Sequence, residues 1–538
     1  MMTEGSLGGY EANVQETLDK LNGEDIVRRI WSKDYTVWKP EPTEISDRIG
    51  WLAVTDFMHE QVPALESFVR EVRDAGFRHI VLLGMGGSSL GAEVIRQVFG
   101  SASGYPQLLV LDSTIPAVVR AVSVTIDPAR TLFLVSSKSG TTTEPQLLLK
   151  YFRNLVEKTK GQAFGQNFVA ITDAGTPLAR LAEKEKFRRV FLNPPDVGGR
   201  YSVLSYFGLV PGALSGLDVN LLLDRADTMR EGCASCIPFP DNHGSWLGAC
   251  LSTLAQAGRD KLTLVTSPSV SSFGLWVEQL IAESTGKEGK GIVPVAGEPL
   301  MPAADYGRDR LFIYLRLKDD DNTATDAAMT NIRSSGQPVV VLEMRDKYDL
   351  GAEFFRWEFA TAVAGALLGI QPFNQPNVQQ AKEATERLLR EYTSSGHLPS
   401  RKITGSLNDL LAKAGPGKYL AIMAYIRPTA EIDEVLAELR RKVLERYHIA
   451  TTLGYGPRYL HSTGQIHKGG PNSGLFLQIT AGHKPDLPIP GEPYTFGVVA
   501  DAQALGDFQA LLANGRAVAD IHLSGAEAAR LRQATEVS

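Results

Sequence analysis

Short apolar runs alternate with helix-length amphipathic segments along much of the first half of the chain. The apolar runs have the length of strands and lie near 79–83, 108–112, 131–135, 168–172 and 189–192. Strands that alternate with helices form parallel sheets with helices on both faces. The pattern therefore predicts a doubly wound α/β domain over 76–230, preceded by a mostly helical segment over 1–75.

The alternation of apolar runs and helices resumes in a second block. Apolar runs lie at 262–265, 311–315 and 339–342, and amphipathic helices continue to about 395. This block predicts a second parallel-sheet domain over 231–395.

The order of elements changes after residue 396. The expected strands are 419–426, 449–454, 474–480, 494–500 and 518–523, and the expected helices are 431–447 and 502–514. This β-α-β-β-β-α-β order predicts a ferredoxin-like or related α+β domain over 396–538. The expected fold class is thus α/β, with two doubly wound subdomains and a C-terminal α+β domain.

Composition narrows the class of protein. With 538 residues, of which 43% are hydrophobic, the chain has the size of two or three globular domains. The net charge is −6 and no run of Lys or Arg occurs, so no nucleic-acid partner is expected. We find neither a signal peptide nor an apolar run long enough to span a membrane, which predicts a cytoplasmic protein with no membrane partner.

The three cysteines are too few for a disulfide framework. Cys233, Cys236, Cys250 and His243 could be drawn as a Cys₃His metal site. Cys250 lies in what looks like the buried face of a helix, where a free cysteine acts as a small apolar residue. We therefore expect no metal and no cofactor.

The loop 136–143 has the composition of a phosphate-binding site. It consists of Ser and Thr residues with Lys138 and Gly140, and it connects the apolar run 131–135 to a helix-like segment. Backbone N–H groups at a helix start favour an anion, hydroxyls donate hydrogen bonds, and Lys138 adds a positive charge. A Ser/Thr-rich helix N-cap is the plain alternative.

A second glycine-rich turn, 84–91, follows the strand 79–83. Its glycines fit the first part of a dinucleotide fingerprint, and Asp112 lies near the end of the next strand, so a dehydrogenase is the competing interpretation. In a parallel sheet this turn and the loop 136–143 emerge at the same edge. Ser88 and the hydroxyls of that loop could therefore bind one phosphate together.

Two further motifs carry groups suited to proton transfer. Gln279 and Glu283 are spaced i, i+4, so they share one face of a helix that ends near Gly286. The negative end of the helix dipole raises the pKa of such a carboxylate toward that of a general base. Arg200 follows Gly198 and Gly199, and a guanidinium there can stabilise developing negative charge.

Together these motifs resemble those of the phosphoglucose isomerase family. The matching segments are 84–88, 137–142, 198–200, Gln279 with 283–287, and 372–378 followed by Lys382, in the family's order. The variant is similar to the isomerase half of bacterial transaldolase/phosphoglucose isomerase fusions. The first 78 residues, which precede the strand 79–83, are too few for a transaldolase barrel.

The resemblance implies two sugar-isomerase (SIS) subdomains and a metal-free interconversion of glucose 6-phosphate and fructose 6-phosphate through a cis-enediol. It also implies a homodimer with shared active sites. Glu283 would move the proton, Arg200 would stabilise the enediolate and Lys382 would assist ring opening. The implied substrate-binding residues are Gly87, Ser88, Ser137, Lys138, Ser139, Thr142, Gln279 and Gln375.

One departure from the family concerns the ring-opening histidine, which the partner subunit usually donates. The family places it between the glutamate motif and the Gln…Lys motif, but no His occurs from 284 to 396. The polar, Gly-rich segment 457–471 carries His461 and His467. Either could fill the role, and we favour His461 as the catalytic residue.

Three alternatives to the leading function stay open. Relaxed activity on mannose 6-phosphate would use the same chemistry. A regulatory protein that senses phosphosugars would need the Ser88 and Ser137 region but not Glu283, Arg200 or Lys382. A nucleotide-dependent dehydrogenase would need an intact G-x-G-x-x-G, which Ser89 interrupts.

Overall fold

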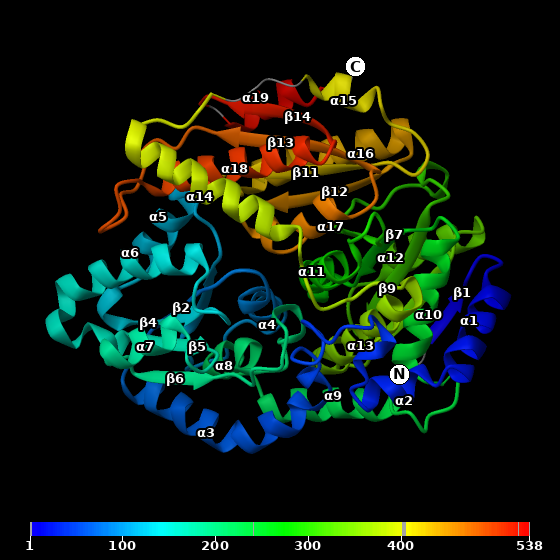
Figure 1. The fold of residues 1–538 in the computed structure, drawn as a ribbon, viewed down its shortest axis with the longest axis horizontal. Coiled ribbons are helices and arrows are strands. Elements are labelled where there is room, and N and C mark those ends of the chain that lie inside the picture. Colours follow the sequence, from blue (N-terminus) through cyan, green and yellow to red (C-terminus); the bar gives the residue numbers. More distant parts are fainter. Residues whose placement is uncertain (1–2, 240, 401–404, 526, 537–538) are drawn as a thin grey trace.

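A computed structural model describes residues 3–239, 241–400, 405–525 and 527–536. Its strands form three sheets, and each sheet is built mainly from parallel strands. In Figure 1 the C-terminal sheet lies across the top, above the first sheet on the left and the second on the right. Among the described residues, we find no helix of the length and apolar character needed to cross a membrane.

The first sheet has five parallel strands in the order β3-β2-β4-β5-β6. The strands are β2 (His79–Leu83), β3 (Gln107–Leu111), β4 (Thr131–Ser136), β5 (Phe168–Thr172) and β6 (Arg189–Leu192). The helices of this region are α3 (Val54–Asp74), α4 (Leu90–Phe99), α5 (Pro116–Thr125), α6 (Thr143–Lys160), α7 (Pro177–Lys184) and α8 (Tyr206–Leu214). All five strands predicted here are confirmed.

The second sheet has the order β1-β10-β9-β7-β8. Its parallel strands are β7 (Lys261–Thr266), β8 (Val293–Ala296), β9 (Arg310–Leu317) and β10 (Val339–Met344), and β1 (Thr3–Ser6) pairs antiparallel with β10. The helices are α1 (Glu11–Gly23), α2 (Ile26–Trp31), α9 (Val219–Gly232), α10 (His243–Gln256), α11 (Phe273–Thr285), α12 (Thr323–Ser334) and α13 (Leu350–Leu368). The chain start therefore contributes an edge strand that the mostly helical expectation for 1–75 missed.

The C-terminal sheet differs from the expectation. Its strands β11 (Tyr419–Tyr425), β12 (Ala450–Tyr455), β13 (Gly474–Ala481) and β14 (Ala517–Leu523) are all parallel, in the order β12-β11-β13-β14. A ferredoxin-like α+β sheet would be antiparallel, so that prediction is wrong in detail and the unit is a third α/β layer. The strand expected at 494–500 forms instead the start of helix α18.

The helices of the C-terminal part are α14 (Val378–Ser395), α15 (Leu407–Leu411), α16 (Ala430–Tyr447), α17 (Gly464–Gly469), α18 (Phe496–Ala513) and α19 (Glu527–Ala534). Thr495 caps α18 by accepting a hydrogen bond from the Val498 N–H, which explains why a helix begins here. Residues of α14 and α18 pack with the core of the first sheet. The fold class of several parallel sheets is confirmed, whereas the domain boundaries at 75, 230 and 395 stay predictions.

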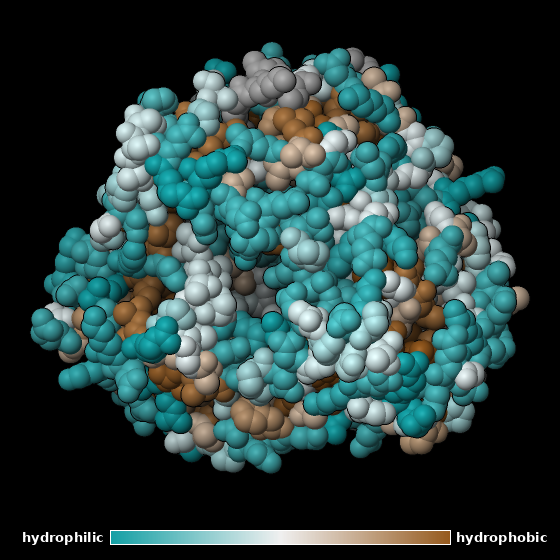
Figure 2. Space-filling view, viewed as in Figure 1, coloured by the Kyte–Doolittle hydropathy of each residue, from teal (hydrophilic) through white to brown (hydrophobic). Residues whose placement is uncertain are grey.

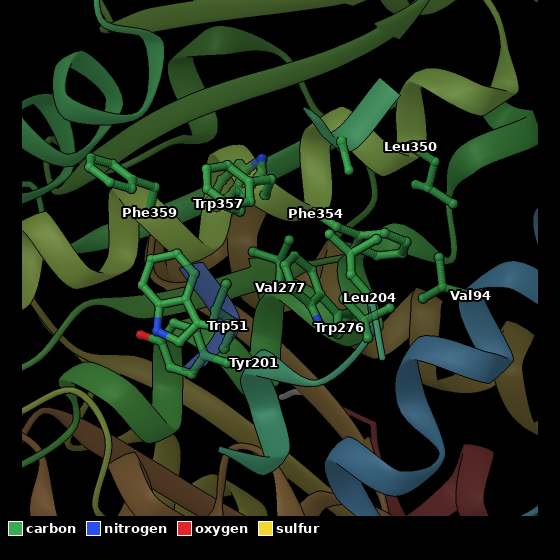
Figure 3. Close-up of a cluster of buried hydrophobic side chains, with 14 of the residues drawn as sticks. Trp51, Val94, Tyr201, Leu204, Trp276, Val277, Leu350, Phe354, Trp357 and Phe359 are labelled. Atoms are coloured by element: carbon green, nitrogen blue, oxygen red, sulfur yellow. The ribbon is translucent and has the colours of Figure 1, made fainter. Parts of the chain in front are cut away.

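An aromatic core supports the elements that will carry the site (Figure 3). Trp276 of α11 packs edge-on against Phe354 of α13, with ring centroids 4.9 Å apart. Trp51 lies against Tyr201, with centroids 5.3 Å apart. Tyr201 follows Arg200 directly and Trp276 precedes Glu283 on one helix, so this core fixes the backbones behind both side chains.

Candidate active site

A cavity of about 490 Å³ brings most of the predicted site residues together. Figure 2 shows a hollow near the centre of this face, in the region where Figure 1 places α14, α11 and the loops of the first sheet. The predicted residues among its lining are Gly87, Ser88, Lys138, Ser139, Thr142, Arg200, Gln279, Glu283, Gln375, Lys382 and His461. Ser137 does not line it but donates a 3.1 Å hydrogen bond to the Thr142 hydroxyl, so it lies directly behind the wall.

The turn after β2 packs tightly against the segment that carries Arg200. A Cβ at Gly87 would lie 2.0 Å from the Gly199 carbonyl oxygen, so only glycine fits. The Ser136 hydroxyl donates a 2.8 Å hydrogen bond to the Ser88 carbonyl and joins this turn to the loop after β4. The Ser88 hydroxyl has no hydrogen-bond partner among the described residues, and it is therefore available to an anion in the cavity.

The loop after β4 presents several hydroxyl groups at the start of α6. The Ser139 and Thr141 hydroxyls lie 2.8 Å apart, and both residues line the cavity. Lys138, which the sequence suggested as a phosphate ligand, forms an ion pair with Asp173 and donates a 3.0 Å hydrogen bond to the Pro195 carbonyl. Part of the positive charge of Lys138 is thus neutralised within the protein, a partner that the sequence did not reveal.

Arg200 is buried and connects the groups at the floor of the cavity. Its Nη1 donates to Glu283 Oε2 and to Gln375 Oε1, each at 3.2 Å. Its Nε donates to the Ser284 hydroxyl at 2.9 Å, and its Nη2 donates to two carbonyls of the segment 372–374. Because five acceptors hold it, the guanidinium has one orientation, and its positive charge lies beside the Glu283 carboxylate.

Glu283 lies on the last turn of α11 and is buried at the cavity floor. Burial raises the pKa of its carboxyl above the usual range, while Arg200 and other cations limit the rise. From the sequence the helix dipole is the expected cause of such a rise, whereas in the structure burial is the largest cause. Gln279, one turn earlier, donates a 3.4 Å hydrogen bond to Glu283 Oε2 and a 2.9 Å bond to the His461 carbonyl.

His461 reaches this cavity from the C-terminal part of the same chain. It ends the short helix η10 (Arg458–His461), and its Nε2 lies 2.9 Å from Glu144 Oε1. Burial alone would raise the pKa of the Glu144 carboxyl, but the charge and hydrogen bond of His461 outweigh it and the pKa is lowered. Glu144 is therefore an anion at neutral pH that holds one nitrogen of His461.

A buried chain of hydrogen bonds continues from Glu144 into α18. Gln503 Nε2 donates to Glu144 Oε1 at 2.7 Å, and the Thr114 hydroxyl donates to Gln503 Oε1 at 2.7 Å. The bond from Thr114 fixes which end of the Gln503 amide faces Glu144. Segments around residues 114, 144, 461 and 503, far apart in the sequence, thus form one network.

The structure separates the two candidate histidines. His467 is buried between aromatic rings, with centroid distances of 5.9 Å to Tyr459 and 5.1 Å to Phe476, and it does not line the cavity. Burial lowers the pKa of its imidazole well below the usual value. His467 is a core residue, and of the two only His461 reaches the cavity.

Asp112, the acidic residue of the dehydrogenase interpretation, is already occupied. Arg458 donates to both of its carboxylate oxygens, at 2.7 and 2.8 Å. This bidentate pair anchors the start of η10, three residues before His461, to the first sheet. Asp112 is therefore not free to bind a ribose hydroxyl.

The sequence did not point to four residues that contribute to the site: Glu144, Gln503, Asp173 and Ser284. Both Glu144 and Ser284 could have been noticed, because Glu144 directly follows the loop 136–143 and Ser284 lies within the segment 283–287. No local signal pointed to Gln503 on α18. Across the described ranges, no group of three or more His, Cys, Asp and Glu side chains could hold a metal ion, and Cys233, Cys236 and Cys250 are free thiols.

The chain thus combines parallel α/β sheets with a cavity that holds a buried carboxylate, a buried guanidinium and hydroxyl-bearing loops. Residues 55–290 match the model of the family described as phosphoglucose isomerase. The matched part contains the two hydroxyl-bearing loops, Arg200 and Glu283. Gln375, Lys382 and His461 lie beyond it.

Curated relatives with a shared name are similar to this chain over about two thirds of its length. A glucose-6-phosphate isomerase of Staphylococcus saprophyticus is 28% identical over 389 residues, which are 64% of this chain and 87% of the relative. One of Streptococcus pyogenes serotype M28 is 29% identical over 392 residues, with the same coverage of both chains.

Two solved structures share the fold. A hypothetical protein of Thermus thermophilus has a TM-score of 0.60 at 25% identity and covers 72% of this chain and 99% of its own. A glucose-6-phosphate isomerase of Chlamydia trachomatis has a TM-score of 0.54 at 19% identity and covers 69% of this chain and 78% of its own. At that identity the second likeness concerns the fold alone.

Proposed function

We propose that this chain interconverts glucose 6-phosphate and fructose 6-phosphate as an aldose–ketose isomerase. The observation that carries the proposal is the pair of Glu283 and Arg200, 3.2 Å apart and buried, in a cavity that a hydroxyl-rich loop at a helix start also lines. The curated relatives named glucose-6-phosphate isomerase support it. A pure phosphosugar sensor would have no use for that pair.

The sugar phosphate binds with its phosphate against Ser88 and the loop 137–142. Their hydroxyls and the N-terminus of α6 favour a dianion. Anchoring the non-reacting phosphate uses its binding energy to orient C1 and C2 beside Glu283. Lys138 contributes its charge from its position against Asp173.

Ring opening transfers a proton from the anomeric hydroxyl to the ring oxygen. His461 carries out this step, with Lys382 beside it, because both line the cavity. Nδ1 of His461 has no hydrogen-bond partner among the described residues, whereas Nε2 is held by Glu144. The ring can therefore present Nδ1 to the sugar.

Isomerisation then moves one proton between carbons and one between oxygens. For fructose 6-phosphate, Glu283 removes a proton from C1 to give the cis-enediolate, the hydroxyl proton on O1 passes to O2, and Glu283 returns its proton to C2 to give glucose 6-phosphate. A carboxyl whose pKa burial has raised suits both halves of this cycle. Arg200 stabilises negative charge on the enediolate, Gln279 and Gln375 hold sugar hydroxyls, and no metal or cofactor takes part.

The test is a coupled assay in which fructose 6-phosphate is the substrate and glucose 6-phosphate is detected, with a chelator present. The proposal predicts turnover that the chelator does not reduce. Binding of fructose 6-phosphate without turnover would favour the sensor, and loss of turnover with the chelator would contradict metal independence. Mannose 6-phosphate in the same assay tests relaxed specificity at C2.

The homodimer implied by the family resemblance is part of the proposal. In the family that the motifs resemble, the dimer is needed because the partner subunit donates the ring-opening histidine. In this chain, His461 of the same chain lines the cavity. Sedimentation equilibrium with activity measured at each concentration is the test. We expect a dimer whose specific activity does not depend on dissociation into monomers.

A further inference from the structure

A second crevice of about 530 Å³ lies at the carboxyl edge of the C-terminal sheet, apart from the candidate active site. Its lining includes Tyr425 and Ile426 at the end of β11, and the segment 481–485 that follows β13. None of the residues that line it also lines the cavity of Glu283.

The crevice lies at the topological switch point of this sheet. β11 and β13 are neighbours, and the helices that follow them cover opposite faces: α16 packs with Leu420 and Ile422, and α18 packs with Ala421 and Met423. Open α/β sheets bind ligands in the crevice that such a divergence creates at the carboxyl ends of the strands. The position alone therefore favours a ligand site.

Helix α5 of the first sheet closes the other side of the crevice. Residues of its first turn and of the face that carries Arg120 and Val124 line it. The site thus lies between two units of the chain, where ligand pockets are common, and its volume is that of a small-molecule site. The first turn also directs the positive end of the α5 dipole toward the crevice.

The charge of the lining is positive. The crevice is lined by three basic side chains, Arg120, Arg427 and Lys484, and by one carboxylate, Glu527. His483 also lines it and pairs with Asp501 at 3.3 Å. Arg427 and Lys484 are exposed and have no ion-pair partner within the described parts of the chain. Arg120 donates to the carbonyls of 485 and 486, while its Nε is buried with no hydrogen-bond partner there. Such unpaired donors suit an anion.

The uncharged part of the lining is apolar. Ile115, Ile426 and Tyr425 line the same crevice as the cations, so an organic group can pack in the crevice that holds a phosphate. We propose that this crevice is a second ligand site, which binds a small organic phosphate through Arg120, Arg427 and Lys484. The proposal does not depend on the isomerase activity of the other cavity.

The test uses the full chain and phenyl phosphate as the probe, measured by isothermal titration calorimetry. One variant is the double substitution Arg427→Gln/Lys484→Gln. The matched control is Lys413→Gln/Arg441→Gln, which removes the same two residue types from exposed positions of the same unit outside the crevice. Thermal unfolding serves as the folding check, and its midpoint should be the same in wild type and both variants.

The expected result is two binding events per wild-type chain, one of which weakens by about tenfold or more in the crevice variant and not in the control. If the crevice variant and wild type give the same isotherm, the proposal is overturned. Phenol binding as tightly as phenyl phosphate would overturn the assignment of an anion. Failure of the isomerase assay leaves this comparison intact, so the two proposals fail separately.

Discussion

Replacing Glu144 by Gln tests how the buried carboxylate acts on His461. Glu144 Oε1 accepts from Gln503 at 2.7 Å and lies 2.9 Å from His461 Nε2. Glutamine has the same shape and keeps an acceptor oxygen, so the variant removes the negative charge and little else. The lowered pKa of Glu144 means that wild type carries this charge at neutral pH.

The magnitude follows from the kind of hydrogen bond that is lost. A bond to a charged partner contributes about 1–2 kcal/mol more than a neutral one, which corresponds to a fall in rate of about 5- to 30-fold. We expect the fall in kcat on fructose 6-phosphate with KM little changed, because Glu144 positions His461 and does not hold the phosphate.

The assay is steady-state turnover of fructose 6-phosphate, with Glu157→Gln as the matched control. Glu157 is on the same helix α6, but it is exposed. Equal kcat values for Glu144→Gln and Glu157→Gln would refute the reasoning, because the charge behind His461 would then have no effect on catalysis.

Three further predictions concern residues around the cavity. Glu283→Gln should raise the free energy of unfolding at pH 7–8, because the raised pKa of Glu283 means that the folded state disfavours the ionised carboxyl. This gain in the free energy of unfolding should vanish below about pH 4.5, where the wild-type carboxyl is protonated in both the folded and the unfolded state. Urea unfolding measured across this pH range is the test, and an absent or reversed trend would contradict the prediction. Gln503→Leu should lower kcat by about 2- to 10-fold with KM unchanged, since one hydrogen bond from a neutral amide to the Glu144 carboxylate is lost. An unchanged kcat would remove Gln503 from the network. Gly87→Ala should abolish activity or stable folding, as measured by turnover and thermal unfolding. The control is Gly415→Ala, where a Cβ would point into open space, and it should leave both activity and folding intact. A fully active Gly87→Ala enzyme would contradict the close approach of Gly87 to Gly199.

The first two sheets could be predicted from sequence because their strands are short, almost wholly apolar runs that alternate with helices. The C-terminal sheet was harder for a physical reason. The segment 494–500 contains Tyr, Phe and two Val residues, which favour a strand locally, yet it includes the start of α18. The Thr495 cap and packing of α18 against the sheet outweigh that weak preference.

The site residues also differ in how far they could be predicted from the sequence. Ser88, Arg200 and Glu283 could be found because each lies in a compact motif. Their mutual arrangement depends on contacts between segments that are far apart in the sequence. The same is true of the pairing of Lys138 with Asp173. No local pattern pointed to Gln503, because its role depends only on its hydrogen bond to Glu144, which lies on a different helix far away in the sequence.

The role of Glu283 as the base can be measured by turnover of fructose 6-phosphate by Glu283→Gln, together with binding of fructose 6-phosphate to the same variant. We expect a fall in kcat of about 10²- to 10⁴-fold, the contribution of a general base, while the dissociation constant changes by no more than a few fold. A variant that keeps kcat within about threefold of wild type would contradict Glu283 as the group that moves the proton.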